Sequence, residues 1–158
     1  MGEKQVAFYE RLWIGIAAVM LVLFLILIGY SLTFSNAVPH SEGKISVANS
    51  RAEFGELGLR QTGPNSYDLR MMAQVYSFQP SDVRVPAGAE ITFYVTSPDV
   101  LHGFHLEGTN INVTAIPGEI ATVKHTFKEP GTFRLICNEY CGIGHQDMLG
   151  QIVVEEAS

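Results

Sequence analysis

An uninterrupted apolar segment near the N-terminus places the strongest limit on how this chain can fold. No charged residue occurs in residues 12–36, and residues 12–32 are mainly Leu, Ile, Val, Ala and Phe. A helix needs about 20 apolar residues to cross the hydrocarbon core of a bilayer, whereas the apolar region of a cleaved signal peptide has about 7–15. Residues 1–36 are therefore predicted to contain one retained transmembrane α-helix, and the lipid bilayer is an expected partner.

The charges that flank this segment predict its orientation. Lys4 and Arg11 precede it, whereas the first basic residue that follows it is Lys44. Positive charges close to a span favour the cytoplasmic side. We expect a single-pass protein of the cell membrane, with a cytoplasmic N-terminus and with the rest of the chain on the outer (periplasmic or extracellular) face.

The exported part of the chain is acidic. Residues 37–158 contain 8 Lys and Arg against 14 Asp and Glu, a formal net charge of −6. Nucleic acid is excluded as a partner by this balance, because its phosphates require clustered Lys and Arg. The same charge is compatible with electrostatic steering of a basic protein partner.

Alternating patterns predict that the C-terminal part of the chain is all-β. Apolar and polar residues alternate with a period of two, which is typical of half-buried strands. The predicted strands lie near residues 66–76, 82–86, 91–96, 121–127, 133–137 and 149–155. Turn-forming pairs such as Pro117-Gly118 and Pro130-Gly131 separate them. Short strands with turns between them predict a sandwich or barrel over residues 66–158, joined to the helix by a linker of polar composition at 37–65.

Both cysteines lie in a short stretch that is rich in metal-binding side chains. Cys137 and Cys141 are followed by His145 and Met148. Thiolate, imidazole and thioether groups are ligands that select copper over harder cations. One Cys with a His and a Met would suggest a single metal ion, whereas two thiolates can bridge two ions. A Cys137–Cys141 disulfide is the alternative, since an oxidising compartment permits it, but such a close pair can form one only in a suitable loop.

A further candidate ligand lies far upstream of this stretch. His102 precedes Cys137 by 35 residues, and a Greek-key sandwich would make the two residues neighbours. One distant His, followed by a loop with Cys, His and Met between the last two strands, resembles the arrangement in the copper-binding cupredoxin sandwich.

The complete pattern resembles subunit II of the haem-copper cytochrome c oxidases. The pattern is Cys-x-Glu-x-Cys-Gly-x-x-His-x-x-Met with His-Gly-Phe-His upstream, and the resemblance covers the helix and the domain from about residue 65 onward. A single N-terminal span in place of two is similar to the B-type branch of that family. The resemblance implies a cupredoxin-like Greek-key β-sandwich preceded by one transmembrane α-helix, in an electron-transfer subunit of a respiratory oxidase.

The resemblance also implies a cofactor, a dinuclear copper centre called CuA. Its implied ligands are the side chains of His102, Cys137, Cys141, His145 and Met148 and the backbone carbonyl of Glu139. The two cysteines would bridge both copper ions, each histidine would bind one ion, and the other two groups would be weak axial ligands. Electrons would come from cytochrome c or a similar donor and leave toward haem in the catalytic subunit I, to which oxygen reduction and proton pumping belong.

Aromatic residues mark the point where the electron enters in this family. Tyr76 and Phe78 occupy the corresponding stretch before Gln79-Pro80, although aromatic residues in strands usually serve packing. Glu139 has a second implied role, because its carboxylate is a magnesium ligand at the subunit junction in many members of the family; a hydrogen-bonded acid is the alternative.

Two other functions are compatible with the sequence. One is the CuA domain of another copper-dependent terminal reductase, such as nitrous oxide reductase, which needs a further large catalytic domain. The other is a membrane-tethered copper-binding protein, which needs an open and exchangeable site. Six enclosing ligands favour permanent retention of the metal and therefore the oxidase subunit.

Overall fold

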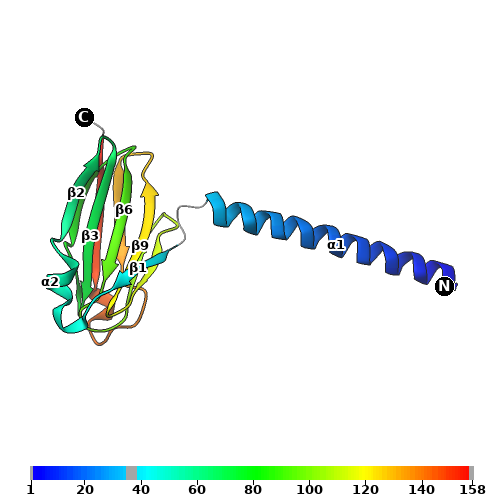
Figure 1. The fold of residues 1–158 in the computed structure, drawn as a ribbon, viewed down its shortest axis with the longest axis horizontal. Helices are drawn as coiled ribbons and strands as arrows, with labels where there is room; N and C mark the ends of the chain where they lie inside the picture. Colours follow the sequence, from blue (N-terminus) through cyan, green and yellow to red (C-terminus); the bar gives the residue numbers. More distant parts are fainter. Residues whose placement is uncertain (1, 35–38, 157–158) are drawn as a thin grey trace. The chain divides into compact units, whose positions relative to one another are not determined.

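The computed structural model describes residues 2–34 and 39–156, and the chain forms two compact units, Met1–Ser35 and Asn36–Ser158. The first unit is a single helix, α1 (Glu3–Phe34) (Figure 1). At 1.5 Å per residue it is about 48 Å long, which exceeds the hydrocarbon thickness of about 30 Å. Within the described residues it is the one helix that is long and apolar enough to cross a membrane. Its apolar side chains are exposed, as at Trp13 and Leu25.

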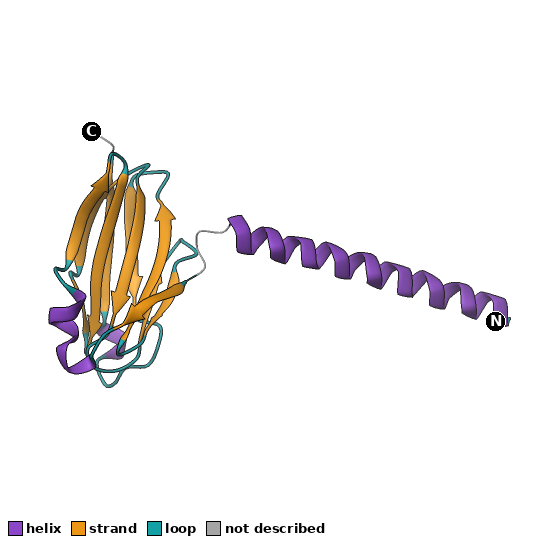
Figure 2. Cartoon of the chain, viewed as in Figure 1, coloured by secondary structure: helices purple, strands orange, loops and turns teal. Residues whose placement is uncertain are grey.

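The second unit is a sandwich of two β-sheets (Figures 1 and 2). Its strands are β1 (His40–Lys44), β2 (Gly58–Gly63), β3 (Ser66–Gln74), β4 (Ser77–Gln79), β5 (Asp82–Pro86), β6 (Glu90–Thr96), β7 (His102–Leu106), β8 (Asn112–Ala115), β9 (Glu119–Thr126), β10 (Gly131–Ile136) and β11 (Leu149–Glu155). Three short helices, η1 (Val47–Asn49), α2 (Ser50–Phe54) and η2 (His145–Asp147), lie in the connections.

One sheet has the order β1-β9-β6-β3-β2, with β4 paired to β3, and the other has the order β5-β11-β10-β7-β8. The pairs β3–β6 and β5–β11 are parallel, and the other pairs are antiparallel. The chain crosses repeatedly from one sheet to the other, which brings segments that are distant in sequence to the same end of the sandwich.

A linker was predicted at residues 37–65; residues 37–38 lie outside the described residues, and residues 39–65 instead contribute two strands to this sandwich. β1 pairs with β9, and β2 pairs with β3. Between them, Phe54 of α2 is buried, and the Arg70 guanidinium lies 5.4 Å from the centre of its ring. Arg70 also donates a hydrogen bond to the Phe54 carbonyl at 2.8 Å. β1 and β2 are edge strands that are largely exposed, so they lack the apolar alternation by which strands are predicted.

The core between the two sheets extends to the N-terminal end of β7. Phe104 packs edge-on against Phe78 and Phe93, with ring centres 5.8 Å and 6.0 Å apart. Side chains two residues apart on a strand point to the same face, so His102 points to the same side as Phe104. Both side chains are completely buried. The fold therefore places His102 at the end of the apolar core.

Residues 36–158 are expected to fold without α1. Every buried apolar residue in the described part of the chain lies in the range from Phe54 to Val154, so removing the helix removes no core residue. We expect this segment, produced alone, to elute as a soluble species in size-exclusion chromatography and to unfold cooperatively when heated, as followed by circular dichroism. Aggregation, or a gradual loss of signal without a transition, would contradict this expectation.

Candidate metal centre

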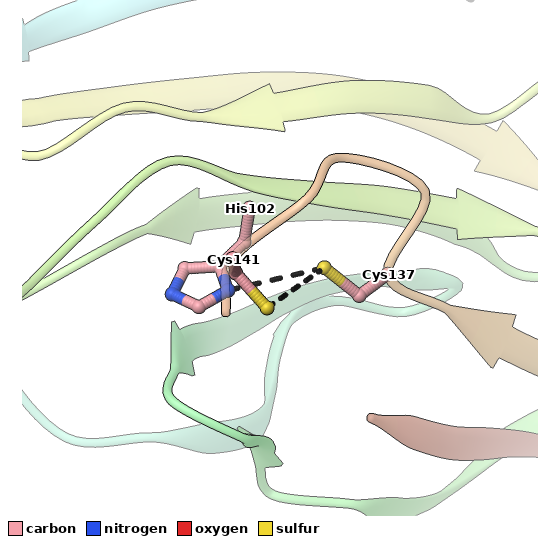
Figure 3. Close-up of side chains that lie close together, drawn as sticks. All are labelled: His102, Cys137 and Cys141. Carbon is pink, nitrogen blue, oxygen red and sulfur yellow. Dashed lines mark hydrogen bonds between the residues drawn. The ribbon is translucent and has the colours of Figure 1, made fainter. Parts of the chain in front are cut away.

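A strand pairing brings the distant histidine to the cysteine-bearing loop. His102 begins β7, Cys137 directly follows β10, and Cys141 lies in the loop that joins β10 to β11 (Figure 3). β7 and β10 are antiparallel neighbours, with His105 opposite Ile136. The separation of 35 residues in sequence is therefore closed by two adjacent strands of one sheet.

The two thiols and the imidazole form a compact, buried cluster. The Sγ of Cys137 lies 3.8 Å from the Sγ of Cys141 and 3.9 Å from the Nδ1 of His102. The exposed fractions of His102, Cys137 and Cys141 are 0%, 3% and 8%. Both cysteines are free, so the disulfide considered from the sequence is not formed.

The loop adds three further donor groups around this cluster. The Sγ of Cys141 lies 3.6 Å from the Nδ1 of His145 and 3.8 Å from the Sδ of Met148. The backbone carbonyl of Glu139 lies 3.2 Å from the Sγ of Cys137 and accepts its hydrogen bond, while the Glu139 side chain is exposed. Met148 is completely buried. The structure thus brings together all six groups that were predicted as ligands.

The donor set fits soft metal ions. Two sulfur ligands at about 2.3 Å from one tetrahedral ion lie about 3.8 Å apart, and the two thiols have a separation of 3.8 Å. A tetrahedral ion takes four ligands, whereas this site contains six donor groups, of which two are the thiols and four lie around them. Thiolate and thioether sulfur select copper over hard cations.

The thiol of Cys141 is protonated at neutral pH when no metal is bound. Burial raises its pKa to about 11, and its hydrogen bond with Cys137 acts in the same direction. A metal binds the thiolate, so loading this site releases a proton.

The two aromatic residues predicted where electrons enter have different surroundings. The ring of Tyr76 packs on the loop backbone: a Cβ atom at Gly142 would lie 2.6 Å from its hydroxyl oxygen, and one at Gly144 would lie 2.7 Å from its ring. Tyr76 is 42% exposed. Phe78 on β4 is 1% exposed and packs against Phe104. Only Tyr76 is therefore able to contact a protein that docks on the surface.

Asp99 contacts the site but was not predicted from the sequence. Its Oδ1 accepts a hydrogen bond from the Nε2 of His102 at 2.8 Å. Burial opposes ionisation of Asp99, but hydrogen bonds from the Val75 N–H, from His102 and from the Val100 N–H keep the pKa of its carboxyl below the usual value. The sequence feature that could have indicated Asp99 is its position as an acidic residue three places before the candidate ligand His102.

Gly103, next to His102, was also missed. A Cβ atom there would lie 1.9 Å from the Oδ1 and 2.6 Å from the backbone nitrogen of Asn138. The loop backbone therefore passes directly over this glycine. His105, two residues after Gly103, makes a different contact: its Nδ1 lies 3.2 Å from the Ile111 carbonyl.

The sequence of this chain is similar to those of known proteins. The family described as cytochrome c oxidase subunit II, periplasmic domain, matches residues 65–157. A cytochrome c oxidase subunit 2 of Thermus thermophilus is 46% identical over 162 aligned positions, which cover 98% of this chain and 96% of that protein. The chain belongs to the cytochrome c oxidase subunit II family. A member of this family is a component of an oxidoreductase and works together with the catalytic subunit of the complex.

Two solved structures are similar to this chain. A chain in a structure of a heme-copper terminal oxidase dimer has a TM-score of 0.76 and 31% identity, covering 93% of this chain and 99% of that one. The periplasmic domain of subunit II from Bradyrhizobium japonicum has a TM-score of 0.54 and 22% identity, covering 61% of this chain and 87% of that one. This similarity supports the fold alone. The predicted cupredoxin-like β-sandwich, preceded by one apolar helix, is confirmed, and the helix indicates a location at the membrane.

Proposed function

We propose that this subunit II holds a dinuclear copper centre, CuA, through which electrons pass to the catalytic subunit. The proposed ligands are the side chains of His102, Cys137, Cys141, His145 and Met148 and the carbonyl of Glu139. The observation that carries this proposal is a pair of buried free thiols 3.8 Å apart, with four further donor groups around them. When bound, such a centre accepts one electron and passes it on.

The surroundings of the thiols suit this task. His102 and Met148 are completely buried, and Cys137 is 3% exposed. Burial and hydrogen bonding around a metal site control its solvent access and redox potential. Donor groups held between β7, β10 and a packed loop change position little when charge changes, so the protein contributes little reorganisation to electron transfer.

The donor is cytochrome c or a similar protein, and it docks where Tyr76 is exposed. Tyr76 contacts the loop at Gly142 and Gly144 and is 42% exposed, so it lies between the surface and the proposed ligands. Haem in catalytic subunit I receives the electron. Lys4 and Arg11 on one side of the span, against Lys44 on the other, support a cytoplasmic N-terminus and a β-sandwich on the outer face.

Electron transfer from reduced cytochrome c tests this function. When the oxidised, copper-loaded chain is mixed with reduced cytochrome c in a stopped-flow instrument, the cytochrome absorbance is expected to change in a phase whose rate rises with protein concentration. If the acidic surface steers a basic donor, this rate falls as salt is added, since screening acts over about 8–10 Å at physiological ionic strength.

A chain with both cysteines replaced by serine is the control and is expected to show no such phase. A wild-type chain that carries its full copper content but leaves cytochrome c reduced would contradict the proposed direction of electron flow.

A further inference from the structure

We propose that Asp99 is a positioning residue of the metal centre, whose two carboxylate oxygens hold His102 and the turn that carries Tyr76 in one fixed arrangement. The inference rests on the proposed function, because it treats His102 as a copper ligand. It adds a residue outside the ligand set and links the exposed aromatic residue to the buried site.

The first oxygen of Asp99 determines which nitrogen of His102 is free to bind metal. Asp99 Oδ1 lies 2.8 Å from the Nε2 of His102. A carboxylate can only accept a hydrogen bond, so Nε2 carries the proton, and in a neutral imidazole the other nitrogen keeps its lone pair. That nitrogen, Nδ1, faces the Sγ of Cys137 at 3.9 Å. Metal-binding histidines commonly donate their second ring N–H to a carboxylate in this way.

The burial of His102 makes this contact difficult to replace. The His102 side chain is 0% exposed, and that of Asp99 is 29% exposed. Water therefore has little access to Nε2, and the ring depends on Asp99 for its orientation.

The second oxygen of Asp99 holds a neighbouring turn. Asp99 Oδ2 accepts a hydrogen bond from the backbone N–H of Val75 at 2.8 Å. Val75 lies directly before Tyr76, between β3 and β4, and the Tyr76 ring lies on the loop at Gly142 and Gly144. The turn is thus fixed on one side by Asp99 and on the other by the metal-binding loop.

Asp99 is itself held in place by its own segment. Its Oδ1 lies 2.6 Å from the backbone nitrogen of Val100 and 3.1 Å from the hydroxyl of Ser97. The Ser97 hydroxyl also lies 2.5 Å from the Val100 carbonyl. These contacts restrict the carboxylate to the orientation in which one oxygen meets the imidazole and the other meets the turn.

The orientation of His102 can be measured in the metal-free protein. Nitrogen-15 NMR of labelled histidine in the full-length chain in detergent is expected to show His102 as a single tautomer with its proton on Nε2. In Asp99→Ala we expect a mixture of tautomers or a shift of the proton to Nδ1. Asp99→Asn keeps an acceptor oxygen for Nε2 but turns an N–H group toward the Val75 N–H, so it should preserve the tautomer and release the turn.

A matched control removes an acidic side chain without touching His102. Asp147 lies in the same loop as the cysteines, and its side chain accepts a hydrogen bond from the side chain of Gln146. Asp147→Asn should therefore leave the ring signals of His102 unchanged. A single Nε2–H tautomer that persists in folded Asp99→Ala would overturn the positioning role.

Copper affinity, measured by competition with a chelator, is the second readout. Loss of a carboxylate that supports a ligand typically lowers metal affinity by about 10–100-fold, so we expect a decrease of about this size in Asp99→Ala and a smaller one in Asp99→Asn and Asp147→Asn. Equal affinity in Asp99→Ala and wild type would overturn the inference.

The two readouts separate this inference from the proposed function. A wild-type chain that binds no copper, but whose His102 tautomer still depends on Asp99, would refute the copper site and leave the orientation of His102 by Asp99 supported.

Discussion

Replacing Cys137 or Cys141 with serine is expected to abolish the two-copper centre, reducing the copper content from two ions per chain to at most one. A serine hydroxyl stays protonated at neutral pH and is a hard donor, so it cannot bridge two soft ions as a thiolate does. Both thiols are buried and 3.8 Å apart, and no other cysteine exists in the chain to take over. Metal analysis and the visible and near-infrared spectrum of the loaded protein measure the change.

The control for both variants is the stability of the metal-free protein. Serine is close to cysteine in size, so the metal-free variants should retain a cooperative thermal transition close to that of the wild type. If either variant stays folded and keeps the spectrum of a mixed-valence copper pair, the two sulfur atoms are not the bridge.

Gly103→Ala is expected to weaken copper binding by at least about tenfold and to destabilise the fold by about 1–3 kcal/mol, as overpacking commonly does. The added methyl group would lie 2.6 Å and 2.7 Å from the backbone nitrogens of Asn138 and Glu139. The backbone cannot move aside without also moving Cys137 and the Glu139 carbonyl. Chelator competition and chemical denaturation measure the two effects.

Two further variants identify the cause of this effect. Gly131 is also in the sheet that contains β7, but a Cβ atom there meets nothing closer than Phe133 at 3.7 Å, so Gly131→Ala should be nearly neutral. Adding Asn138→Ala to Gly103→Ala removes the clash with the amide oxygen but leaves the backbone contacts, so little recovery is expected. Wild-type copper affinity and stability in Gly103→Ala would show that the loop does not need this close approach.

The alternation of apolar and polar residues predicts β5 correctly, because this strand has one buried face. β5 alternates between exposed and buried positions, and the predicted range of 82–86 agrees with its bounds. β1 is exposed on nearly all positions and β7 is buried on nearly all positions, so neither shows a period of two. This is why residues 37–65 resemble a linker in sequence, and why β7, the strand that begins at His102, is not among the predicted strands.

Part of the site can be predicted from residues that are close together in the sequence, whereas another part depends on contacts between residues that are far apart in it. The spacing of Cys137, Cys141, His145 and Met148 within one loop already specifies a set of soft donors. The role of Asp99 depends on Val75, 24 residues away, which no local pattern reveals.

The exposure of Tyr76 and of Phe78 also cannot be predicted from their spacing in the sequence. They are two residues apart, yet one is 42% exposed and the other 1%. Tyr76 belongs to the turn before β4 and Phe78 belongs to β4 itself, so strand alternation does not relate their orientations.

Copper stoichiometry, combined with electron paramagnetic resonance, tests the central claim most directly. The full-length chain is loaded with copper, freed of excess metal, and analysed for copper per chain and for the hyperfine pattern of its unpaired electron. The proposed centre predicts two copper ions per chain and one unpaired electron shared equally by two copper nuclei. One copper ion per chain, with hyperfine coupling to a single nucleus, would contradict it.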